Sequence, residues 1–187
     1  MTSRPTLTTL ALLLTGAFAP RAFASGFQLR EQSPSAQGSA FAGVSAASAD
    51  IGGMFFNPAT LTAFEGFQCL LGASAVSPKA ELEGASARRA TALGGGPISG
   101  SSSHPDSAKN ALLPNLYAMW SPTGDLRLGL SLNAPFGLVT QYDSGFIGRY
   151  HALKSDLQTV DLALNVAYRL HPSLSLGASL IYRRVDA

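Results

Sequence analysis

The chain has 187 residues, of which 46% are hydrophobic and only 13% charged, about half the charged share of an ordinary soluble domain. Its 13 Lys and Arg against 11 Asp and Glu leave no concentrated basic face, which argues against nucleic-acid binding. The 19 Gly and 11 Pro argue against a helix-rich protein, and the longest apolar stretch, Leu7–Ala19, is too short for a membrane-spanning helix of about 20 residues.

The first 24 residues have the pattern of an export signal. Arg4 precedes the apolar stretch Leu7–Ala19, and the tripeptide Ala-Phe-Ala at 22–24 forms a small-residue cleavage site. This pattern predicts cleavage before Ser25, with Ala-Phe-Ala at 17–19 as a second possible site. The structural alternative is a buried N-terminal helix. An exported chain fits the single cysteine, Cys69, which cannot form an internal disulfide.

Residues 25–65 do not alternate between apolar and polar positions. A start of Ser-Gly-Phe-Gln-Leu at 25–29 is followed by a run rich in Ser, Ala and Gly, and then by Phe-Phe-Asn-Pro-Ala at 55–59. The pattern predicts a compact segment ahead of the first strand.

The rest of the chain predicts strands. Apolar residues recur at every second position in 126–134, 159–170 and 174–183, and successive strand side chains point to opposite faces. Two weaker segments, 67–77 and 114–121, are also predicted as strands. With 126–134, and with the other two alternating segments extended to 157–170 and 174–184, the sequence predicts about five strands. Short turns at 122–125 and 171–173 alternate with long loops at about 78–113 and 135–155.

Two all-β architectures share such alternating strands. A soluble sandwich exposes a face that is usually rich in Lys, Glu and Thr, whereas the polar face here is mostly Gly, Ser, Ala and Asn. Strands of this length, alternating short and long connections and an export signal favour an antiparallel transmembrane barrel, with the apolar face toward lipid.

Five short segments carry a family resemblance. They are Gly-Phe-Gln-Leu at 26–29, Asn-Pro-Ala at 57–59, Pro-Asn-Leu at 114–116, Pro-Phe-Gly at 135–137 and Ala-Tyr-Arg-Leu at 167–170. In order and spacing, residues 25–187 resemble the FadL family of outer-membrane transporters for long-chain fatty acids and hydrocarbons, which includes toluene and xylene channels.

The resemblance implies an organisation and a location. Residues 1–24 would be the signal peptide, 25–65 an N-terminal hatch that plugs a barrel of 14 strands, and 66–187 the first part of that barrel. Five strands cannot close a barrel, so we expect the chain to be an N-terminal fragment or a truncated product. With the hatch at the periplasmic side, the long loops lie outside and the short turns inside. The implied location is the outer membrane of a Gram-negative bacterium.

The resemblance also implies function and partners. The expected function is passive, cofactor-free uptake of long-chain fatty acids or aromatic hydrocarbons, with lateral exit through a kinked strand. Implied partners are the ligand, outer-membrane lipid and the barrel assembly machinery, with a monomer as the full-length state. A porin for other small solutes and a structural or adhesion barrel are the alternatives.

Gly26 and Phe27 are candidates for ligand gating, because the family's matching phenylalanine lies near its binding pocket. Simple packing within the hatch is the alternative for Phe27. Asn57, Pro58 and Ala59 are candidates for anchoring the hatch to the barrel wall, since Asn offers donors and acceptors and Pro fixes φ; a plain turn is the alternative.

Asn133, Pro135 and Gly137 are candidates for the kink at the lateral exit. Proline cannot donate to a strand ladder and glycine permits bends, although a strand simply ending in a loop has the same sequence signature. Arg183 and Arg184 are candidates for binding a ligand carboxylate. Alternation points Arg183 inward and Arg184 outward, and a solvated strand end is the alternative for both.

Nothing in the sequence predicts catalysis or a resident metal. His104, His151 and His171 have no paired spacing for a metal and no thiol or carboxylate cluster beside them. Asp161 and Arg169 share one strand face, where polarity of the barrel interior is the simpler interpretation than acid–base chemistry.

Overall fold

The computed structural model describes residues 28–187. The predicted export signal and its cleavage site, together with Gly26 and Phe27, lie outside these residues.

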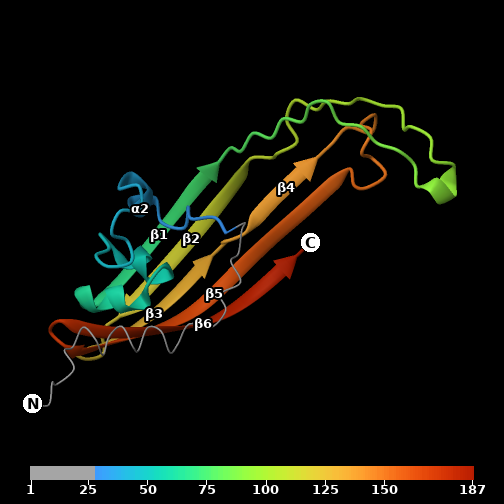
Figure 1. Cartoon of the computed structure of the whole chain (residues 1–187). Coiled ribbons are helices and arrows are strands. Elements are labelled where there is room, and N and C mark those ends of the chain that lie inside the picture. The colour runs from blue at the N-terminus through green and yellow to red at the C-terminus, as the bar shows by residue number, and fades with distance from the viewer. Residues whose placement is uncertain (1–27) are drawn as a thin grey trace, which may run out of the picture.

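One antiparallel sheet of six strands forms the body of the structure (Figure 1). The strands are β1 Phe67–Val76, β2 Ala111–Trp120, β3 Leu126–Asn133, β4 Gly137–Gln141, β5 Lys154–His171 and β6 Leu174–Asp186. Their order is β1-β2-β3-β5-β4, where β3 and β4 pair with successive parts of one edge of β5. β6 pairs with the other edge of β5. The all-β, antiparallel fold class predicted from the sequence is confirmed.

The sequence predicted about five strands, and the structure divides the sheet into six. Residues 137–141 were expected in a long loop, but they form β4 and pair with the start of β5. β2 also begins three residues earlier than predicted, at Ala111. Both misses involve proline: Pro135 precedes the five-residue β4, and Pro114 lies inside β2, so each proline looked like the edge of a loop.

β3 and β4 are two parts of one interrupted wall strand. Asn133 pairs with Asp161 and Gly137 pairs with Gln158, so three residues of this strand, 134–136, face only two of β5. This is the geometry of a β-bulge, in which one extra residue bends the strand while the inward and outward faces keep their alternation on both sides.

The two faces of the sheet differ in chemistry. The outward face exposes large apolar side chains along β3, β5 and β6, including Leu128, Leu130, Leu132, Val160, Leu162, Leu164, Leu176 and Leu180. The opposite face carries buried small and polar residues, among them Ser131, Asp161, Ala163, Asn165 and Ala167. Soluble proteins rarely expose an apolar surface of this extent to water. A face of this kind is instead suited to contact with the hydrocarbon interior of a membrane.

Short helices cover the polar face at one end of the sheet (Figure 1). They are α2 Pro34–Gly38, η1 Ile51–Phe55 and η2 Pro58–Ala63, and we call residues 28–64 the hatch. Side chains of Ser33, Asp50 and Asn57 cap their N-termini. The core lies between hatch and sheet and is formed by Ile51, Met54 and Leu61 on one side and Tyr117, Met119 and Ala167 on the other.

The long connections extend past the sheet at the end away from η1 and η2 (Figure 1). The β1–β2 connection carries η3, Thr91–Leu93, and contacts the β4–β5 connection through a bridge between Ser101 and Phe146. Within the described residues, no helix is both long enough and apolar enough to cross a membrane.

Candidate functional site

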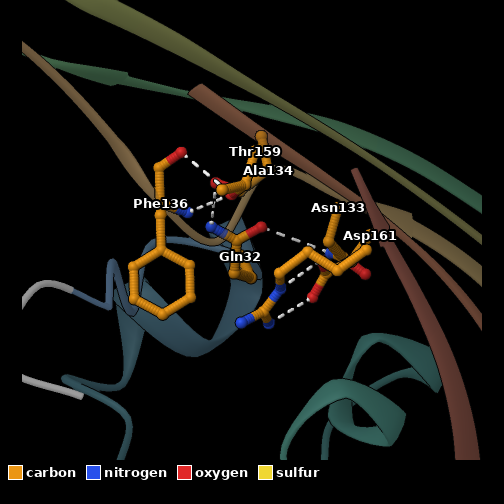
Figure 2. A network of polar contacts seen from close by, with 7 residues as sticks. Gln32, Asn133, Ala134, Phe136, Thr159 and Asp161 are labelled. Atoms are coloured by element: carbon orange, nitrogen blue, oxygen red, sulfur yellow. Dashed lines mark hydrogen bonds and ion pairs between the residues drawn. The ribbon is translucent and has the colours of Figure 1, made fainter. Parts of the chain in front are cut away.

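The hatch holds the interrupted strand at the point where its ladder is lost (Figure 2). The Leu29 N–H donates to the Pro135 carbonyl at 2.8 Å, and the Gln32 side-chain amide donates to the Ala134 carbonyl at 3.0 Å. On the β5 side, Thr159 exchanges hydrogen bonds with the backbone of Phe136 through its N–H and its hydroxyl. Carbonyl groups freed by the bulge are therefore satisfied by the hatch, as buried backbone requires.

A buried network continues from this point into the sheet. The Tyr117 hydroxyl donates to the Gln32 carbonyl at 2.7 Å and accepts from the Asn133 amide at 2.6 Å. Gln32 and Tyr117 are completely buried and Asn133 nearly so. Because each buried polar group finds a partner, the network ties the end of β3 to the hatch at little desolvation cost.

A cavity of about 490 Å³ opens beside the interruption. The β2–β3 ladder ends at Leu116 and Leu132, and a further backbone bridge joins Ala108, ahead of β2, to Thr140 of β4. The cavity between these points is lined by Leu29 of the hatch, by outward-facing residues such as Leu112, Pro114 and Val160, and by Leu113, Phe136, Gly137, Leu138 and Val139. Its lining therefore includes residues from both the hatch side and the lipid side of the wall.

Strand register separates the two arginines of β6. Arg183 lies opposite Asp161 on the inward face, and Arg184 lies opposite Val160 on the outward face, as alternation predicted. Arg183 donates from Nε and Nη2 to the two Asp161 carboxylate oxygens, both at 2.7 Å, and its guanidinium lies 4.8 Å from the centre of the Phe136 ring. Arg184 instead pairs with Asp186 at 3.1 Å and is mostly exposed.

The Asn-Pro-Ala segment lies against the wall and also forms a cap. The Asn57 side chain accepts from the Ala59 N–H and donates to the Ser45 carbonyl, so it closes the start of η2 within the hatch. The backbone of Pro58 and Ala59 packs directly on Gly177 of β6, where any side chain larger than hydrogen meets backbone atoms.

Two wall arginines that the sequence did not single out as anchors bind the last turn of the hatch. Arg127 of β3 is 1% exposed and donates to the Phe64 carbonyl at 2.6 Å, and Arg169 of β5 donates to the Thr62 carbonyl. Each lies on the inward face of its strand, where the predicted hatch had to pack. A long cation at an inward position was the available signal for such an anchor.

No group of three or more His, Cys, Asp or Glu side chains suited to a metal ion occurs within residues 28–187. The site is instead an opening in the sheet that is apolar over most of its lining and is held by the hatch. Lys109 is a charged residue of this lining, and the Arg183–Asp161 pair lies next to it, against Phe136. An antiparallel sheet with a lipid-like outer face and a plug on its inner face defines part of a plugged outer-membrane wall.

Comparison with known proteins gives the family. Residues 16–187 match the model of the outer membrane protein transport protein family (OMPP1/FadL/TodX), and the chain belongs to this family of outer-membrane transporters. A long-chain fatty acid transport protein of Escherichia coli O6:H1 is 32% identical over 158 residues, which cover 84% of this chain and 33% of the relative. Outer membrane protein P1 of Haemophilus influenzae Rd is 34% identical over 179 residues, covering 91% and 38%.

A solved structure shares the fold. The crystal structure of a Pseudomonas aeruginosa FadL homologue superposes with a TM-score of 0.74 at 21% identity, over 86% of this chain and 38% of that one. The chain spans about a third of the length of the relatives it matches. The family resemblance inferred from the sequence is confirmed.

Proposed function

We propose that the protein takes up long-chain fatty acids or other hydrophobic compounds passively across the outer membrane, without a cofactor and without catalysis. The observation that carries this function is the cavity beside the interrupted strand, whose lining includes residues from both the hatch side and the lipid side of the wall. The printed function of the E. coli relative, long-chain fatty acid transport, agrees with it. Hydrophobic burial supplies about 0.8 kcal/mol per CH2, enough to hold an alkyl chain in an apolar passage.

We propose lateral exit at the interruption, and the same geometry supports it. Pro135 and Gly137 flank Phe136 at the bulge, and Asn133 fixes the end of β3 through Tyr117 and Gln32. A ligand that leaves through the wall reaches lipid without crossing water, so the hydrophobic driving force is kept along the whole path. In this account Asn57, Pro58 and Ala59 keep the hatch on the wall while the ligand passes.

We infer lipid as the surrounding partner of this wall, and the exposed outward leucines support this inference. We infer insertion by the barrel assembly machinery and a monomeric working state, because a plugged barrel completes its passage within one chain. The long connections lie outside the cell and the short turns in the periplasm.

Gly26 and Phe27 belong to this proposal as gating residues. Gln28 and Leu29, which follow them directly, line a second cavity of about 370 Å³ together with Phe136 and Leu138. We expect Phe27→Ala to change the affinity for a bound alkyl ligand several-fold while leaving the thermal unfolding temperature unchanged. Equilibrium binding of labelled dodecanol to the purified protein measures this, and an unchanged affinity contradicts the gating role.

The contents of the purified protein test the function itself. We expect organic extraction of protein purified from outer membranes, followed by mass spectrometry, to release an apolar ligand in roughly stoichiometric amount. Planar-bilayer recordings of the same sample should show no sustained ion conductance. An empty protein with steady conductance contradicts the proposal and favours a porin, because a wide aqueous pore conducts ions and retains no lipid.

A further inference from the structure

An inward row of three polar side chains crosses the sheet beside the opening. Asn133 of β3 lies opposite Asp161 of β5, and Asp161 lies opposite Arg183 of β6. Asp161 is only 4% exposed, so its carboxylate is removed from water. A carboxylate in this position needs a counter-charge, and Arg183 is the cation that its oxygens contact.

The geometry of this pair occupies one edge of the Arg183 guanidinium and neutralises its charge. Two parallel hydrogen bonds of 2.7 Å join the guanidinium to both oxygens of Asp161, the strongest arrangement for these groups. The guanidinium also lies over the Phe136 ring at 4.8 Å, within cation–π range. The cation is thus held on one edge by a carboxylate and on one face by an aromatic ring.

The pair lies next to the passage without lining it: Arg183 lies over the Phe136 ring, and Phe136 lines both cavities at the interruption. A ligand moving through the opening therefore passes an ion pair whose net charge is zero. A ligand carboxylate would lose its water there, find Arg183 already neutralised and meet the like charge of Asp161. A neutral alkyl compound pays none of these costs.

We propose that Asp161 sets the specificity of this passage, so that it favours neutral hydrophobic compounds, such as hydrocarbons and long-chain alcohols or esters, over free carboxylates. This inference rests on the proposed uptake of hydrophobic compounds and names the substrate class within it. Asp161 acts by neutralising Arg183, and it contacts the ligand only when a second anion competes for that arginine.

Three ligands of equal chain length test the inference: dodecanoate, methyl dodecanoate and 1-dodecanol, each radiolabelled, with equilibrium binding measured at pH 8 on the detergent-purified protein. We expect the wild-type protein to bind the ester and the alcohol at least tenfold more tightly than dodecanoate. Asp161→Asn keeps the size of the side chain and frees the charge of Arg183. It should tighten dodecanoate binding at least tenfold and change the alcohol less than twofold.

The matched control is Asp156→Asn, on the same strand but paired with Lys154 and away from Arg183; it should leave all three affinities unchanged. A wild-type preference for dodecanoate, or an unchanged preference in a folded Asp161→Asn protein, overturns the inference. If Asp161→Asn does not fold, the wild-type comparison of ester and carboxylate still decides. Wild-type protein that binds none of the three ligands overturns the proposed function itself, which separates the two failures.

Discussion

Gly177→Val should detach the hatch from the wall. A Cβ at this position would lie 2.3 Å from the Ala59 backbone nitrogen and 2.8 Å from the Pro58 carbonyl carbon, and neither atom can move without shifting η2. Overpacking against side chains costs about 1–3 kcal/mol, and contact with backbone places this substitution at or above the upper end of that range. We expect a clear fall in the temperature at which the folded, heat-modifiable gel band disappears, with rapid proteinase K cleavage of the hatch.

Ala178→Val is the matched control, because it places the same valine side chain on the next residue of β6, on the outward face opposite Val166. It should leave both the gel transition and the protease pattern unchanged. Equal effects of the two substitutions would contradict direct packing of the hatch on Gly177.

Arg127→Met should also lower the stability of the protein strongly. The Arg127 guanidinium donates to the Phe64 carbonyl at 2.6 Å, to Thr123 at 2.8 Å, and to Gly124 and Leu126 at 3.0 Å each. Methionine fills the volume of the stem but removes the charged donor that these four carbonyls share. Hydrogen bonds to a charged group contribute about 1.5–3 kcal/mol each, so loss of the set should lower the free energy of unfolding by about 3 kcal/mol or more.

Urea unfolding of the protein in lipid vesicles measures this change. Arg89→Met, in the exposed β1–β2 connection, is the control and should stay within about 0.5 kcal/mol of wild type. If both variants unfold at the same urea concentration, Arg127 does not anchor the hatch and its carbonyl contacts carry no net stability.

Period-two alternation predicted β3, β5 and β6 to within a few residues, because their two faces meet different surroundings along their whole length. β4 escaped prediction because five residues after a proline show too little alternation to separate a strand from a loop. The register between β5 and β6 could be predicted from the sequence. A short turn at 171–173 makes paired positions sum to a constant value, which places Asp161 opposite Arg183.

The contacts of the hatch could not be predicted in the same way. Gln32 meets Ala134 and Asn133 across more than 100 residues of chain, and no local pattern encodes which inward side chain faces which turn of the hatch. The role of two glycines of the wall could not be predicted from local sequence either. Gly129 and Gly177 look like ordinary weak strand positions in the sequence, but the structure uses them where Leu61, Pro58 and Ala59 approach most closely.

Deletion of Pro135 tests directly whether hydrophobic compounds leave through the opening at the interrupted strand. Removing one residue from 134–136 leaves two residues opposite Thr159 and Val160, so β3 can continue into β4 in register. The continuous strand can then approach the part of β2 before Leu116, which has no partner on that edge within the described residues. The measurement is the initial rate of uptake of labelled dodecanol by cells, beside a control that lacks Gly95 in the exposed loop. We predict that the Pro135 deletion lowers the rate at least tenfold at equal amounts of folded protein, while the Gly95 deletion leaves it unchanged. Uptake at the wild-type rate through a folded, uninterrupted strand would contradict lateral exit.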